Sequence, residues 1–119
     1  MAERLSFDTS FLIDFQRERR TAGDGPAHEF LKNHGSAHLA ISAVVLGEFA
    51  EGFDDADHPL VRVIRDTHEV LPIDDQVARI YARVTRELRQ QGQLIGGNDL
   101  WIAATSLHNQ LALVTADRT

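Results

Sequence analysis

Cysteine is absent from this chain of 119 residues, and lysine occurs only once, at Lys32. The absence of cysteine excludes disulfide bonds, thiolate zinc sites and a cysteine nucleophile. It also fits a reducing compartment, so we expect the protein to be cytoplasmic. Long hydrophobic runs are missing as well, which predicts no membrane span. The first residues lack a basic segment followed by an apolar one, so no signal peptide is expected.

Acidic residues outnumber basic ones, with eighteen Asp and Glu against twelve Lys and Arg, and the formal net charge is −6. The chain as a whole therefore lacks the basic character that usually supplies affinity for nucleic acid. Two observations weaken this argument, because the basic residues are almost all arginine and they are clustered. An acidic surplus is also expected where several carboxylates gather around a divalent cation. The length argues for a single domain over residues 1–119.

Short apolar runs alternate with helical patterns along the chain. We predict strands at residues 4–7, 38–41, 69–73 and 111–115, and helices at about 9–20, 26–33, 43–52, 59–67, 75–91 and 98–109. Thr9 or Ser10 is expected to cap the first helix, Ser42 the third and Asp74 the longest. Alternation of strand and helix implies parallel strands joined by right-handed crossovers. The predicted fold is a three-layer α/β/α domain with a short parallel central sheet, with its site at the carboxyl ends of the strands.

Four acids stand in surroundings that are unusual for a carboxylate. Asp8 follows the first predicted strand, and Asp117 comes two residues after the last one. Asp99 lies at the start of a predicted helix. Glu48 shares a helical face with apolar neighbours such as Phe49, where a carboxylate is costly unless its charge is satisfied. In the predicted fold these positions open onto one edge of the sheet, so we expect the four carboxylates to converge.

Carboxylates at close range repel one another unless a cation neutralises them. All-oxygen ligation suits Mg²⁺ or Mn²⁺, and such an ion can lower the pKa of a bound water or clamp a displacement at phosphorus. The simpler alternative is that Asp8 and Asp99 cap helices and Asp117 lies in a turn. Glu48 fits that alternative least, because it is not at a cap position.

Five segments match a family pattern in their order and spacing. They are FDTSFLID at 7–14, ISAVVLGE at 41–48, VLPID at 70–74, IGGNDLWIAA at 95–104 and LVTAD at 113–117. Together they extend over essentially the whole chain. With these segments the sequence resembles the PIN-domain ribonucleases, and most closely the VapC-like toxins of bacterial toxin–antitoxin pairs.

The resemblance implies a Mg²⁺- or Mn²⁺-dependent endoribonuclease that is the toxin of such a pair. Asp8, Glu48 and Asp99 match the family's three core metal-site acids, and Asp117 matches its more variable fourth acid. Thr9 and Thr115 match two hydroxyl positions beside the metal. The implied partners are an RNA substrate, a small antitoxin protein whose C-terminal segment occupies the groove, and a second copy in a homodimer. Family members usually continue beyond the last acid, so we expect this chain to lack the family's C-terminal tail.

Arginine recurs at helical spacing along the longest predicted helix, at Arg79, Arg83, Arg86 and Arg89. One interpretation is that this stripe contacts the phosphates of RNA entering the acidic site. The other is that it forms a solvated helix face paired with nearby acids. Asn98 likewise has two interpretations, since it either donates to a metal-bound water or caps its helix.

Two other function classes share parts of this pattern. The first is a catalytically silent binding module, whose acids form a groove for a partner peptide. The second is a phospho-receiver signalling domain, which has a similar length and α/β pattern and also binds Mg²⁺. That class needs paired acids after the first strand, where this chain has Asp8 and Thr9, and a lysine after a late strand, where it has none.

Overall fold

In the computed structural model of the protein, residues 3–21, 25–93 and 95–116 are described. Their elements in chain order are β1 (Arg4–Phe7), α1 (Thr9–Arg20), α2 (Pro26–Asn33), β2 (His38–Ser42), α3 (Ala43–Glu51), α4 (Pro59–Thr67), β3 (Glu69–Leu71), α5 (Asp75–Gln90), α6 (Gly97–His108) and β4 (Ala112–Val114). None of the helices within these ranges is long and apolar enough to span a bilayer. The strands form one sheet with the order β3-β2-β1-β4, and every pair in it is parallel.

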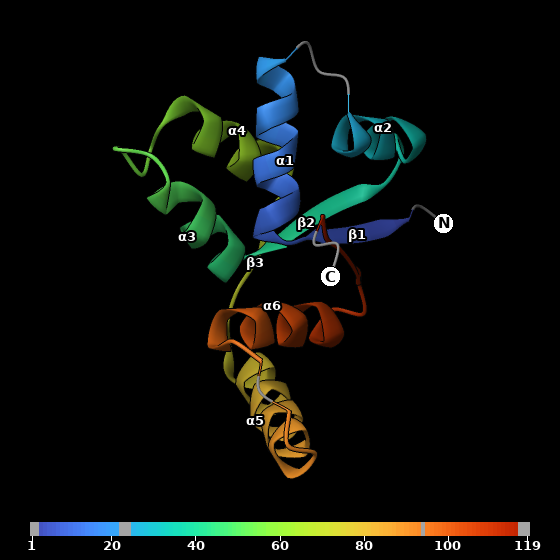
Figure 1. Ribbon diagram of the computed structural model, residues 1–119, viewed down its shortest axis with the longest axis vertical. Helices are drawn as coiled ribbons and strands as arrows, with labels where there is room; N and C mark the ends of the chain where they lie inside the picture. Colours follow the sequence, from blue (N-terminus) through green and yellow to red (C-terminus); the bar gives the residue numbers. More distant parts are fainter. Residues whose placement is uncertain (1–2, 22–24, 94, 117–119) are drawn as a thin grey trace.

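The helices cover both faces of the sheet. Figure 1 shows α1, α2 and α4 on one side and α6 on the other, with α5 packed against the outer side of α6. Parallel strands this short need such cover, because both of their faces are apolar. The predicted three-layer α/β/α fold with a short parallel central sheet is therefore confirmed.

The core is centred on β1, which lies between β2 and β4. Phe7 pairs in register with Ile41 of β2 and with Val114 of β4. Phe7 and Ile41 are fully buried, and the Phe7 ring stacks on Phe11 of α1 with 4.6 Å between ring centroids. Replacing a buried phenylalanine by alanine costs about 3–5 kcal/mol, so this packing fixes the end of β1 firmly. The residue that follows directly is Asp8.

Helix α5 holds the start of α6 in place. Val77 is fully buried, and the Tyr81 ring stacks on Trp101 of α6 at 3.8 Å between centroids. Tyr81 also backs the first turn of α6, where a Cβ on Gly97 would lie 4.0 Å from its hydroxyl oxygen. This turn carries Asn98 and Asp99, so α5 supports the part of the site that α6 supplies.

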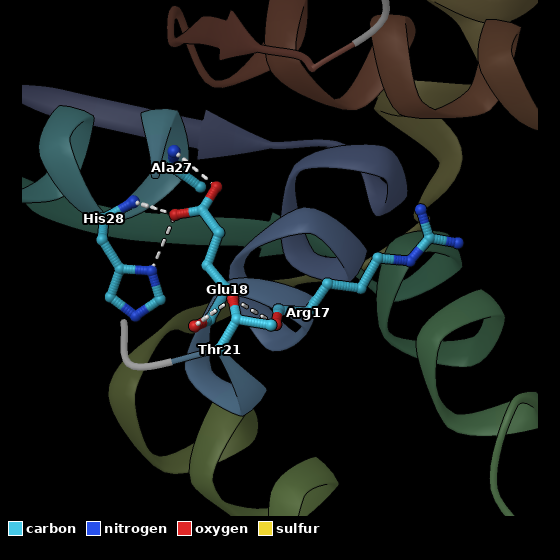
Figure 2. Close-up of polar contacts among 5 residues, drawn as sticks. All are labelled: Arg17, Glu18, Thr21, Ala27 and His28. Carbon is cyan, nitrogen blue, oxygen red and sulfur yellow. Dashed lines mark hydrogen bonds and ion pairs between the residues drawn. The ribbon is translucent and has the colours of Figure 1, made fainter. Parts of the chain in front are cut away.

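Glu18 joins α1 to α2. Gly25 precedes α2 and offers no side chain to cap it. Glu18 instead accepts hydrogen bonds from the backbone N–H groups of Ala27 and His28, both at 2.9 Å, and contacts Nδ1 of His28 at 2.8 Å (Figure 2). Burial raises the pKa of this carboxyl, but the hydrogen bonds from His28 and Ala27 outweigh that effect, and the pKa of Glu18 is lowered overall.

Two of the three predicted helix caps are confirmed. Ser42 caps α3 and Asp74 caps α5, each accepting from the backbone N–H three residues further on. The prediction for the first helix was wrong, because Asp8 caps α1 in place of Thr9 or Ser10. Both Thr9 and Ser10 lie inside the helix, and their hydroxyls are engaged elsewhere.

Two strands are shorter than predicted. β3 ends at Leu71, because Pro72 has no N–H with which to continue the ladder. β4 begins at Ala112, since the N–H of Leu111 donates to the carbonyl of Ser106 at 2.9 Å and closes α6. The helix that precedes it also starts one residue earlier than predicted, at Gly97.

Candidate active site

Three of the four predicted acids line a single cavity. Asp8, Glu48 and Asp99 surround a space of about 270 Å³, together with Thr9, Ser10 and Ile102. Each acid comes from a different part of the fold: Asp8 from the end of β1, Glu48 from α3 and Asp99 from the first turn of α6. The cavity therefore lies at the carboxyl ends of the strands, where open parallel sheets place their sites. The fourth acid, Asp117, lies outside the described residues.

Asp8 is held by contacts from two directions. Its backbone N–H donates to the carbonyl of Val114 at 3.1 Å, which ties the end of β1 to β4. Its Oδ1 accepts from the N–H of Phe11 at 3.0 Å and from the hydroxyl of Ser10 at 2.7 Å. Ser10 is fixed in turn by the N–H of Ala116, which donates to it at 3.2 Å. Asp8 is thus a helix cap, as the simpler alternative supposed, but through one oxygen only, and Oδ2 accepts no hydrogen bond from the described residues.

Glu48 is held by both of its oxygens. The hydroxyl of Thr9 donates to Oε1 at 2.5 Å, and the amide of Asn98 donates to Oε2 at 3.1 Å. These bonds satisfy a carboxylate that would otherwise be costly next to the buried Phe49. Asn98 does not cap its helix, since Gly96 takes the cap position of α6. Three elements, α1, α3 and α6, therefore meet at Glu48.

Asp99 is an exposed carboxylate in the first turn of α6. It does not cap the helix, because the capping residue is Gly96, which has no side chain. The N-terminal end of a helix carries a partial positive charge, which favours a negative side chain at this position. Asp99 lines the cavity, and no described residue donates a hydrogen bond to it.

The pattern that defines the PIN domain matches residues 6–119, almost the entire chain. The chain belongs to the PIN-domain family. The resemblance of its motifs to that family is confirmed, and the three acids are part of the pattern's matched range.

Known relatives of this PIN domain are named ribonucleases. Ribonuclease VapC1 of Methanocaldococcus jannaschii is 27% identical over 116 residues, covering 97% of this chain and 76% of that protein. Ribonuclease VapC5 of Mycobacterium tuberculosis is 43% identical over 49 residues, which are 41% of this chain and 36% of that protein.

Solved structures share the fold of this PIN domain. The crystal structure of VapBC2 from Rickettsia felis, bound to a DNA fragment from the VapBC2 promoter, matches with a TM-score of 0.79 at 21% identity. The match covers 96% of this chain and 87% of that chain. A toxin–antitoxin complex from Klebsiella pneumoniae matches with a TM-score of 0.74 at 24% identity, over 95% of this chain and 86% of that chain. At these identities the likeness establishes the fold.

The donors around the cavity suit a hard divalent cation, since all of them are oxygens. Among the described residues, one carboxylate oxygen of Asp8 and both of Asp99 have no hydrogen-bond partner, whereas both oxygens of Glu48 are hydrogen-bonded. In the described part of the chain, no three His, Asp or Glu side chains are arranged to hold a metal ion as they stand. The donor chemistry of the PIN domain therefore fits a cation, and Glu48 would share with it an oxygen that already accepts a hydrogen bond, since each carboxylate oxygen has two lone pairs.

The remaining predicted residues that the structure describes do not line the cavity of the acids. Thr115 is exposed after β4, with its hydroxyl 3.3 Å from that of Ser10. All four arginines of the stripe are exposed on α5, and none of them lines the cavity of the acids. The stripe stays a prediction.

Sequence reasoning missed three residues near the acids. Ser10 orients Asp8 through a hydrogen bond, and Arg17 and Arg20 line a second cavity that shares Glu48 with the first. The spacing of Arg17 and Arg20 places them on one face of α1, but their proximity to Glu48 depends on how α1 packs on α3.

Proposed function

We propose that this protein is a divalent-metal-dependent endoribonuclease and the toxin of a toxin–antitoxin pair. The observation that carries the proposal is the cavity lined by Asp8, Glu48 and Asp99 at the carboxyl ends of the sheet. Family membership supports it, because the relatives of this PIN domain are named ribonucleases. RNA is the proposed substrate, and the reaction is hydrolysis of its phosphodiester bonds.

The three acids are the proposed ligands of Mg²⁺ or Mn²⁺. A bound ion supplies a water of lowered pKa and stabilises negative charge that develops at phosphorus. Asp8 offers Oδ2 while Oδ1 keeps α1 capped, and Asp99 offers both of its oxygens. Glu48 would contribute a remaining lone pair of an oxygen that already accepts a hydrogen bond from Thr9 or Asn98. Asp117 is proposed as the fourth acid of the site, and Thr115 as a hydroxyl beside it.

Three polar side chains position these acids. Ser10 restricts the rotation of the Asp8 carboxylate, whereas Thr9 and Asn98 hold Glu48 from opposite sides. Fixed side chains reduce the reorganisation that the reaction demands, so we expect these residues to affect rate more than folding.

We also propose an antitoxin protein as a partner. The solved structures that share this fold include toxin–antitoxin complexes and VapBC assemblies. A homodimer, a single nuclease domain over residues 1–119 and action in the cytoplasm complete the proposal. The absence of cysteine agrees with that compartment.

The decisive experiment is a cleavage assay on total RNA with Mg²⁺ or with EDTA, followed by mapping of the new ends. We expect cleavage with Mg²⁺ and none with EDTA. The control is Asp8→Asn, which is expected to abolish cleavage with the fold intact, because asparagine also caps helices. Cleavage by this variant that persists in EDTA would refute the metal mechanism.

A catalytically silent binding module is the second candidate, and one observation favours it: within the described residues, no three His, Asp or Glu side chains are arranged to hold a metal ion. Isothermal titration with Mn²⁺ separates the two. A silent module takes up no Mn²⁺, whereas the nuclease shows saturable uptake that weakens in Asp99→Asn.

A further inference from the structure

A second cavity lies beside the acids, between α1 and α3. Its volume is about 280 Å³, and its walls are one face of α1 and one face of α3 with the loop that follows. Glu48 lines both this cavity and the one that contains Asp8 and Asp99. The two spaces therefore meet at Glu48.

Two arginines stand along this second cavity. Arg17 and Arg20 lie about one helical turn apart on the same face of α1, and both are exposed. Figure 2 shows the side chain of Arg17 extending toward α3, while that of its neighbour Glu18 extends the opposite way toward α2. The positive charge of Arg17 and the negative charge of Glu18 therefore lie on opposite sides of α1.

The ion pairs among the described residues include neither Arg17 nor Arg20. Within residues 3–21, 25–93 and 95–116, no carboxylate lies within ion-pair distance of Arg17 or Arg20. Glu18, the nearest acid in sequence, is occupied by Ala27 and His28. Exposed guanidinium groups without partners present planar donor pairs that match the geometry of a phosphate.

We propose that Arg17 and Arg20 bind successive backbone phosphates of the RNA strand next to the bond that is cleaved. This inference rests on the proposed nuclease function, which brings an RNA strand to the acids. The two arginines would hold the strand along α1 and direct it to the cavity of Asp8 and Asp99. Phosphate contacts of this kind fix register and orientation without reading sequence. The arginines of α5 line neither cavity.

The test measures binding of a labelled single-stranded RNA in EDTA, where no cleavage is expected, over a range of salt concentrations. Replacing both arginines, Arg17→Ala with Arg20→Ala, is expected to weaken binding at least tenfold. It should also reduce the slope of log affinity against log salt by about 1.4, since each lost phosphate contact removes about 0.7. Lysine at both positions should restore most of the slope, because it keeps the charge.

Arg19→Ala is the matched control. Arg19 lies on the same helix and carries the same charge, but it lines the apolar cavity between α1 and α4, to which Arg17, Arg20 and Glu48 do not contribute. We expect its salt slope to equal that of the wild type. Circular dichroism of every variant checks that α1 remains folded, and the lysine pair gives a reading even where the alanine pair unfolds.

The outcomes separate this inference from the nuclease proposal. If the wild type cleaves RNA and the double alanine variant binds RNA as tightly as the wild type, the phosphate site is overturned and the nuclease proposal stands. Loss of binding in a protein that never cleaves supports the phosphate site and overturns the nuclease. If the double alanine variant binds RNA like the wild type but no longer binds polyglutamate, the cavity is a site for an acidic peptide and the RNA contact is overturned. A wild type that binds no RNA overturns both proposals.

Discussion

Thr9 donates a hydrogen bond to Glu48 at 2.5 Å, and this contact joins the first residue of α1 to the middle of α3. The bond satisfies a carboxylate that is partly buried beside an apolar helix face. It also links Glu48 to Asp8, because Thr9 follows Asp8 directly in the chain. A change at Thr9 should therefore act on two acids of the proposed site at once.

Thr9→Val is expected to lower the cleavage rate roughly ten- to hundredfold, because the Glu48 carboxylate loses its fixed position. Valine keeps the branched shape but lacks the hydroxyl, so the loss of stability should be only about 1 kcal/mol. Thr67→Val is the matched control, since the Thr67 hydroxyl bonds backbone carbonyls within α4. Single-turnover cleavage and urea unfolding measure the two effects. Equal rates for both variants would contradict a positioning role for Thr9.

The two roles of Asp8 can be separated by comparing two substitutions. Asp8→Asn retains a side-chain oxygen that accepts from the N–H of Phe11, whereas Asp8→Ala removes the cap of α1. We expect Asp8→Ala to lower the free energy of unfolding by about 1 kcal/mol relative to Asp8→Asn. Both variants should lose cleavage, because neither offers a carboxylate. Urea denaturation gives the first comparison and the RNA assay gives the second.

A contrary result would be equal stability of the two Asp8 variants. That result would show that the cap contributes little, and the main task of Asp8 would then lie in the cavity. Cleavage that survives in Asp8→Asn but not in Asp8→Ala would instead make the cap the essential role.

The order of strands and helices follows from local features of the sequence. Apolar runs too short for helices alternate with segments of helical spacing, and Ser42 and Asp74 stand where helices begin. Glu48 could be singled out because a carboxylate on an apolar helix face needs a partner. Each of these signals depends on only a few neighbouring residues, so it can be recognised in the amino-acid sequence alone.

The partners of these residues could not be predicted in the same way. Thr9 lies 39 positions from Glu48, and Asn98 lies 50 positions from it on the other side. Such contacts depend on the packing of α1 and α6 against α3, for which the sequence holds no periodic signal. The cavity that contains Arg17 and Arg20 is missed for the same reason, since neither helix shows it alone.

The stability of the protein should depend on Glu18 in acid. The folded state lowers the pKa of Glu18 below its ordinary value of 4.5, because the hydrogen bonds from His28 and Ala27 favour the charged form. An acid whose pKa is lower in the folded state than in the unfolded state stabilises the fold, and this stabilisation is fully present at pH values above the pKa of the unfolded state. This contribution is lost as the pH falls through the folded pKa. We therefore expect the stability difference between wild type and Glu18→Gln to shrink as the pH drops below about 4.5.

Urea unfolding at a series of pH values measures this difference. Glu51→Gln is the control for losing one negative charge, since Glu51 is exposed at the end of α3 and accepts no hydrogen bond from the described residues. Its stability relative to wild type should not follow the pattern of Glu18→Gln. A stability difference for Glu18→Gln that stays constant down to the acid transition would argue against the clamp between α1 and α2.

The arginine stripe on α5 leads to a separate prediction for RNA that extends beyond the two cavities. Arg86→Ala is expected to weaken binding of a long single-stranded RNA and to flatten the salt dependence by about 0.7, the effect of one phosphate contact. Arg62→Ala is the comparison, because Arg62 is also an exposed arginine and lies on α4, on the other side of the sheet. A short RNA that reaches only Arg17 and Arg20 should bind Arg86→Ala like the wild type. If the long RNA does so as well, the stripe is a solvated helix face, and the strand leaves the acids along α1 alone.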